Sequence, residues 1–316
     1  MSGHHHHGID PALEASGQGV RALQVSLVAL LLTALLQLGV TLVSGSVALL
    51  GDTLHNFADA LTALPLWLAF SMGRRRPNRR FTYGYGRAED LAGIVVVGAI
   101  AVSAAVAAWE AVLRIRHPHD VHHLPFVMAA AVIGMLGNEL VAVYRIRVGR
   151  QIGSAALVAD GLHARTDGLT SLAVLLGAIG VALGWRLADP IVGLAISVAI
   201  LLVLVDAGRR VWERLMDAVD PSLVDQGRSL LSAVEGVEGV SDLRIRWIGH
   251  RLHAEARITV DRDLGIAEAH DISERAHHEL LHHLPRLSGA LVHADPCDHD
   301  GSDPHARTAH HFPEGR

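Results

Sequence analysis

Two short strings in this chain each place a histidine four residues before an aspartate, His55 with Asp59 and His163 with Asp167. An α-helix advances 3.6 residues per turn, so residues four apart lie on the same face. Each string therefore directs an imidazole and a carboxylate the same way. Two such helices facing each other would offer two nitrogen and two oxygen ligands, a set that suits zinc and is acceptable to cobalt.

Both strings lie in stretches that are apolar enough to cross a bilayer. Half of the 316 residues are hydrophobic, 19% are charged, and the mean hydropathy is +0.32. An ionisable residue at membrane depth costs roughly 2.5–3.5 kcal/mol on insertion scales, so Asp59 and Asp167 need a compensating partner. A divalent cation is the natural partner. Protons compete with it for the same lone pairs, which gives a physical basis for exchange.

The elements that must hold these strings are membrane-spanning helices. A hydrocarbon core about 30 Å thick needs about 20 helical residues, and six stretches of the chain are long enough. The sequence therefore predicts a polytopic α-helical membrane protein. The expected spans are residues 21–43, 48–72, 89–113, 124–145, 154–183 and 187–208.

Arginine sets the expected orientation of these spans, because the chain contains no lysine. Arginine clusters follow the second, fourth and sixth spans, whereas the opposite side carries only Arg114, Arg116 and Arg186. By the positive-inside rule, the clusters and both termini face the cytoplasm. We expect a multi-pass protein of the bacterial inner membrane.

The character of the chain changes after Asp220 and Pro221. Residues 222–296 alternate helical patterns with period-two strand patterns, which predicts a small cytoplasmic α+β domain of ferredoxin-like type. The single cysteine, Cys297, excludes a disulfide framework and a multi-cysteine metal site. The expected organisation is a tail over 1–20 containing the run His4 to His7, either native or a tag, a transport domain over 21–209, the α+β domain over 210–296, and a disordered His-rich tail over 297–316.

Three motifs carry a resemblance to a known family. They are residues 44–59 (SGSVALLGDTLHNFAD), 83–89 (YGYGRAE) and 159–167 (ADGLHARTD). In this order they resemble the second-helix, third-helix and fifth-helix signatures of the cation diffusion facilitator family, in its zinc type. The resemblance implies a homodimeric antiporter that exports divalent metal from the cytoplasm in exchange for protons. It also implies that His55, Asp59, His163 and Asp167 form the transport site.

Other charged residues have two readings each. Asp52 and Asp160 lie one turn before a histidine and either orient the metal ligands or cap and solvate their helices. Arg87 and Asp217 match positions that form an ion pair between the membrane and cytoplasmic parts of relatives. The alternative is two unrelated charges.

The sequence gives weaker support for a metal-binding site in the cytoplasmic domain than for one in the membrane. His270, His293 and Asp295 match positions that bind regulatory metal in some relatives. However, Ser241 and Arg257 stand where histidines occur in those relatives, and an arginine repels a cation. Further histidines with helical spacing form either a surface metal patch or a solvated face; these are His277, His278, His282 and His283.

Two alternatives from other classes stay open. The string from His278 to His282 fits the His-Glu-x-x-His pattern of zinc hydrolases, although no third ligand is evident. A metal sensor with a transporter fold is the second alternative. The favoured reading is a transporter and not an enzyme, with no cofactor and no nucleic-acid partner. Zinc is its expected cargo and a candidate regulatory ligand, and cobalt, iron, manganese or cadmium are the alternative cargoes.

Overall fold

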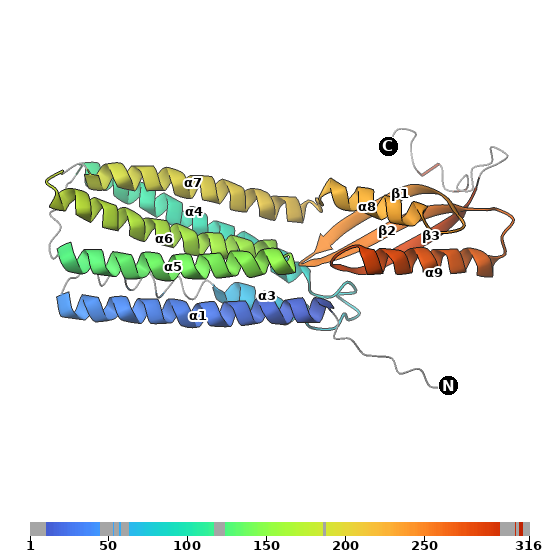
Figure 1. Cartoon of the computed structure of the whole chain (residues 1–316), viewed down its shortest axis with the longest axis horizontal. Helices are drawn as coiled ribbons and strands as arrows, with labels where there is room; N and C mark the ends of the chain where they lie inside the picture. The colour runs from blue at the N-terminus through green and yellow to red at the C-terminus, as the bar shows by residue number, and fades with distance from the viewer. Residues whose placement is uncertain are drawn as a thin grey trace. The chain divides into compact units, whose positions relative to one another are not determined.

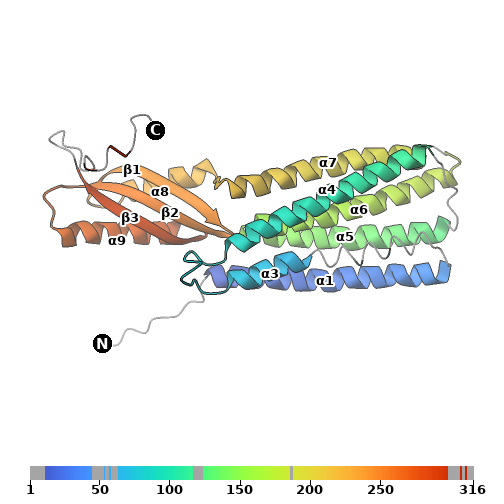
Figure 2. The same ribbon diagram turned by 180° about the vertical axis from the view of Figure 1, so that it is seen from behind.

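The computed structural model describes residues 11–44, 53, 57, 63–116, 124–185, 188–297, 307, 310 and 311. The chain divides into two compact units, Met1–Met216 and Asp217–Arg316. Figures 1 and 2 show the first unit as long, roughly aligned helices and the second as a sheet with helices.

The first unit is a helical bundle. Among the residues that the structure describes, five helices are long and apolar enough to cross a membrane, and Ala63–Gly73 is a shorter apolar helix. This confirms the predicted polytopic fold. The helices are α1 (Pro11–Ser44), α3 (Ala63–Gly73), α4 (Arg87–Arg116), α5 (Leu124–Ile152), α6 (Ala155–Ala182) and α7 (Ala188–Leu215).

The predicted second span, residues 48–72, is described only in part. Its end is α3, and Thr53 and Phe57 are helical. Asp52, His55 and Asp59 lie outside the described residues, as does the run His4 to His7.

Helices α5 and α6 are in close contact, and glycine makes that contact possible. A Cβ placed on Gly161 would lie 2.7 Å from Ile146 Cγ1 and 2.9 Å from the Ile146 backbone nitrogen. A Cβ on Gly149 would lie 2.9 Å from the backbone nitrogen of Val158. The two backbones therefore approach each other directly, which small residues permit in membrane bundles.

The turn between α5 and α6 is fixed by specific hydrogen bonds. Gly153 has a φ of 79°, a conformation that glycine adopts without strain. Ser154 caps α6 by accepting a hydrogen bond from the Leu157 backbone N–H at 3.0 Å. Arg214 of α7 donates to the carbonyl oxygen of Gly153. These contacts fix where α6 begins.

Helix α1 packs on α5 through a buried polar side chain, Gln37. Gln37 is fully buried and its Nε2 donates to the Ala130 carbonyl at 3.1 Å. A Cβ on Gly134 would lie 2.7 Å from Gln37 Nε2 and 2.8 Å from Ser171 Oγ, so the absence of a side chain at Gly134 leaves room for both polar groups. Polar side chains of this kind bridge helices where water is absent.

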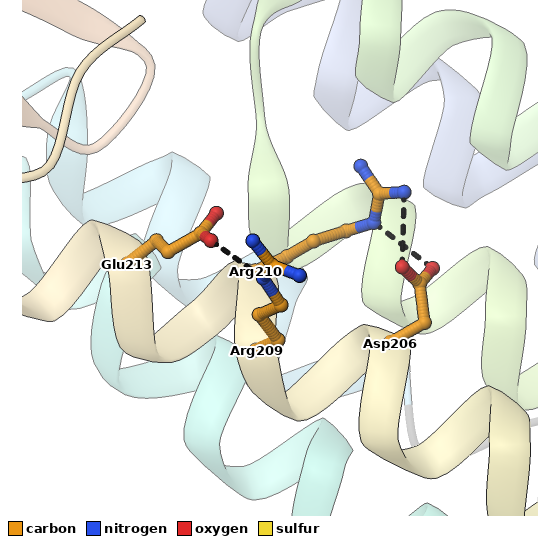
Figure 3. A network of polar contacts seen from close by, with 4 residues as sticks. All are labelled: Asp206, Arg209, Arg210 and Glu213. Carbon is orange, nitrogen blue, oxygen red and sulfur yellow. Dashed lines mark hydrogen bonds and ion pairs between the residues drawn. The ribbon is translucent and has the colours of Figure 1, made fainter.

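Helix α7 continues beyond residue 208, where the expected sixth membrane span ends. Its last turns carry two exposed ion pairs at i,i+4 spacing, in which Arg210 Nε donates to Asp206 Oδ2 at 3.0 Å and Arg209 Nε to Glu213 Oε1 at 2.8 Å (Figure 3). Ion pairs with this spacing stabilise the part of a helix whose surroundings are no longer apolar. The division between the two units accordingly falls after Met216.

The second unit is a three-stranded sheet with two helices. Strand β1 pairs antiparallel with β2, and β2 pairs parallel with β3, in the order β1-β2-β3. The parallel pair is joined by α9. The elements are α8 (Pro221–Ser232), β1 (Val237–Ile248), β2 (Arg251–Val260), α9 (Ile266–His283) and β3 (Leu287–Pro296).

One face of this sheet packs on the helices. Leu243 and Ile258 from the strands, Leu231 from α8 and Leu280 from α9 share one buried cluster. Asp220 caps α8, since its Oδ1 accepts hydrogen bonds from the Ser222 backbone N–H at 2.9 Å and from the Ser222 hydroxyl at 2.8 Å. The two hydrogen bonds lower the pKa of the Asp220 carboxyl. The predicted α+β domain is therefore confirmed.

Candidate transport site

Helix α6 presents His163 and Asp167 together. His163 is 2% exposed and Asp167 is 8% exposed. The distance from His163 Nδ1 to Asp167 Oδ1 is 3.7 Å. Two ligands held by one tetrahedral zinc ion at about 2.0–2.2 Å stand roughly 3.3–3.5 Å apart. The observed 3.7 Å is slightly longer than this spacing, so a small rotation of either side chain would let both atoms bind one ion.

The other half of the predicted site is not described, since His55 and Asp59 lie outside the described residues. Their neighbour Thr53 contacts α1, with its Oγ1 3.0 Å from Thr41 Oγ1. The assignment of His55 and Asp59 as ligands therefore stays a prediction.

Asp160, predicted either to orient the ligands or to cap its helix, lies in a buried ion pair. Its Oδ2 is 2.9 Å from Arg145 Nη1 of α5, and the two side chains are 0% and 1% exposed. Among the described residues, Asp160 Oδ1 and Arg145 Nε have no hydrogen-bond partner. The Asp160 carboxylate therefore points toward α5. A role of Asp160 in orienting a metal ligand stays a prediction.

This role of Arg145 was not predicted from the sequence. Residue 145 is the end of the fourth expected span, 124–145, but α5 continues to Ile152 and buries Arg145 inside the bundle. The available signal was its position among Val143, Tyr144 and Ile146, which continue the apolar pattern of the span. An arginine within such a pattern requires an acidic partner.

A second ion pair joins α5 and α6 on another side of α6. Arg165 donates from Nε to Glu139 Oε2 at 3.2 Å and from Nη2 to Oε1 at 2.7 Å. The side chains are 35% and 47% exposed. Arg165 stands between His163 and Asp167 in sequence, so the segment that carries the ligands is held to α5 by two separate ion pairs.

The predicted pair of Arg87 with Asp217 would join the two units. Within the first unit, Arg87 Nη1 lies 3.5 Å from Asp90 Oδ2. Asp217 has a φ of 56° and begins the second unit. The pair therefore stays a prediction.

In the second unit, His293 Nε2 lies 2.9 Å from Asp295 Oδ1. His270 is exposed on α9. Within the described part of the chain, no three side chains of His, Cys, Asp or Glu gather as a metal site. Arg257 is the register partner of His293, and Ser241 Oγ donates to the Arg257 carbonyl at 3.3 Å. A regulatory site thus remains a prediction.

A bundle of apolar helices that buries a His/Asp pair, followed by a small α+β unit, is the architecture of a multi-pass membrane protein with a candidate cation site. The family model of the cation efflux transmembrane domain matches residues 23–216, and that of the cation efflux protein cytoplasmic domain matches residues 219–297. The chain belongs to the cation efflux family, which is the cation diffusion facilitator family predicted from the motifs. It is therefore an integral, multi-pass transporter of metal cations.

Two relatives that match most of the chain agree with this membership. A probable cation efflux system protein of Mycobacterium tuberculosis is 56% identical over 296 residues, which cover 94% of this chain and 89% of that protein. The manganese efflux system protein MneP of Bacillus subtilis is 26% identical over 284 residues, covering 86% of this chain and 95% of that protein. A solved nickel form of the MamM CTD is 25% identical and covers 25% of this chain and all of that chain, with a TM-score of 0.25.

Proposed function

We propose that the protein is a zinc/proton antiporter that exports metal from the cytoplasm by alternating access. The observation that carries the proposal is the buried pair of His163 and Asp167 on one face of α6. His55 and Asp59 of the second span complete the site in this proposal. Two imidazoles and two carboxylates make a tetrahedral set with two negative charges, which balance one divalent ion.

Proton coupling follows from the same ligands. Without a cation, the negative charges of two carboxylates inside a membrane protein would be uncompensated. Protonation of a carboxylate or imidazole costs less free energy than leaving these charges unpaired while the empty site returns to the cytoplasmic side. Metal entry releases those protons because both bind the same lone pairs. The antiport therefore needs no separate proton site.

The arrangement of the protein in the membrane is part of the proposal. In this proposal both termini face the cytoplasm and the membrane is the inner membrane of a bacterium; the arginine clusters after the second, fourth and sixth spans support this orientation. The protein acts as a homodimer. Support for a dimer comes from the match of residues 219–297 to the family's cytoplasmic domain.

Zinc is the proposed cargo because nitrogen ligands favour it over manganese, which prefers more oxygens. Manganese is the second candidate, because one relative is named a manganese efflux protein. The chain keeps histidines at positions 55 and 163, which favours zinc between the two.

The test is a competition assay in sealed vesicles that contain only this protein. A proton gradient is applied, and entry of zinc, cobalt, iron, manganese and cadmium is measured together with the internal pH. The proposal expects zinc to move against the proton gradient and to compete best. Metal movement without any proton movement would contradict antiport, and preferred manganese transport would contradict the cargo.

A further inference from the structure

The last turns of α9 carry imidazoles that the proposed transport cycle does not use. His278 and His282 lie one turn apart, with ring centroids separated by 4.1 Å and ring planes tilted by 46°. Both side chains are exposed. We propose that His278 and His282 chelate a d-block cation such as Zn²⁺, Ni²⁺ or Cu²⁺ on the surface of the second unit.

The geometry favours chelation by these two residues. Two nitrogens bound to one tetrahedral ion at about 2.0–2.1 Å stand roughly 3.3–3.4 Å apart. Side chains on adjacent turns, with rings already in contact, reach that separation by rotation about their own side-chain bonds. No backbone change is needed, and water completes the coordination. Imidazole nitrogen selects zinc, nickel and copper over magnesium and calcium, which prefer oxygen ligands.

The electrostatic surroundings also favour a cation. His282 lies in the last turn of α9, where the backbone carbonyls give the helix end a partial negative charge. Arg275, one turn before His278, forms an ion pair with Asp271 and donates a hydrogen bond to the Glu235 carbonyl at 3.1 Å. Its positive charge is therefore compensated.

Neighbouring histidines on the same helix differ from this pair. His283 Nδ1 lies 3.1 Å from Glu279 Oε2, so its i,i+4 partner is a carboxylate and not an imidazole. His277 is half-buried. Substitutions of these two residues are matched controls, because they remove one imidazole from the same helix without removing the chelating pair.

The test is hydrogen exchange of the full chain with Ni²⁺ as the probe. Imidazoles in general bind nickel and the chain has 22 histidines, so the readout must be the backbone amides of α9, where the proposed site lies (Figure 1). A cation that bridges adjacent turns opposes local opening. At about ten times its dissociation constant, it slows exchange there about tenfold.

We expect this slowing in the parent chain and in His277→Ala and His283→Ala, and its loss in His278→Ala and His282→Ala. Mg²⁺ should give no slowing. The proposal is wrong if a variant that combines His278→Ala with His282→Ala keeps the slowing, if His283→Ala loses it, or if the parent shows none with millimolar Ni²⁺. Because the readout concerns α9 alone, the result does not depend on whether the protein transports zinc.

Discussion

Arg145 Nη1 of α5 lies 2.9 Å from Asp160 Oδ2 of α6, and both side chains are almost completely buried. The pair stands one turn before His163 on the helix that carries the candidate ligands. Together with the close backbone approach at Gly161, it sets the rotation of α6. The direction in which His163 and Asp167 point thus depends on a contact that binds no metal.

Breaking the Arg145–Asp160 pair should destabilise the membrane unit strongly. Asp160→Leu leaves the Arg145 guanidinium buried without its partner. In comparable buried pairs, this lowers the free energy of unfolding by about 3–5 kcal/mol. The double change Arg145→Met with Asp160→Leu removes both charges and should restore most of the stability. The measurement is the apparent melting temperature of the purified variants in detergent.

The matched control for this experiment is Glu139→Gln. It breaks the other ion pair between α5 and α6, in which both side chains are partly exposed. Such pairs contribute about 0–1 kcal/mol, so the melting temperature should fall only slightly. A double variant no more stable than Asp160→Leu would contradict the assigned role of the buried pair.

Gly161→Ala should separate α5 from α6. The added Cβ would overlap Ile146, including its backbone nitrogen, which cannot move independently of α5. Overpacking of this kind costs typically about 1–3 kcal/mol. Gly98→Ala in α4 is the control, because a Cβ there meets nothing within 4 Å. Thermal unfolding of the two variants in detergent compares them, and equal melting temperatures would refute the close packing.

His163→Asp should shift the cargo preference toward harder ions. The change leaves one nitrogen and three oxygen ligands in the proposed site, and manganese prefers more oxygen ligands than zinc does. Transport assays with paired metals should show a larger manganese-to-zinc ratio than in the parent. His270→Asp, on the exposed surface of α9, should leave the ratio unchanged. An unaltered ratio in His163→Asp would mean that this residue does not contact the cargo.

His253 should make the second unit less stable in mild acid. Burial and the nearby charges of Arg246 and Arg251 hold the pKa of its imidazole below the ordinary value. The unfolded chain therefore takes up a proton at a higher pH than the folded one. Stability conferred by the neutral imidazole is complete above the unfolded pKa of about 6.5 and declines as the pH falls toward the folded pKa.

Replacing His253 by Gln should flatten this decline. The probe is alkylation of Cys297, whose thiol is buried and whose backbone N–H donates to the Val260 carbonyl at 2.8 Å. Urea titrations at several pH values, each followed by labelling at one fixed pH, report the stability of the second unit. His270→Gln should keep the decline of the parent. The same decline in His253→Gln would show that another group is responsible.

The order of elements could be predicted from the sequence because their patterns are long and local. The apolar stretches gave the membrane helices, and period-two alternation gave strands such as Arg251–Val260. The pairing of His163 with Asp167 followed from helical spacing alone. Each of these predictions depends on neighbours within one or two turns.

Contacts between helices could not be predicted in the same way. The partner of Asp160 is on α5, and the apolar neighbours of Arg145 indicate only that it needs an acidic partner, not which one. The Glu139–Arg165 pair likewise depends on the register of two helices. The expected sixth span ends near residue 208, where the apolar pattern stops, whereas α7 continues to Leu215 and its last turns carry exposed ion pairs.

The most direct test of the central claim is zinc transport by variants of the two candidate aspartates. Asp59→Ala and Asp167→Ala proteins are reconstituted beside the parent and Glu139→Gln, and insertion is checked for each. With a proton gradient, we expect the parent and Glu139→Gln to carry zinc and both aspartate variants to lose transport. Zinc movement by correctly inserted aspartate variants at the parent rate would contradict the proposed site.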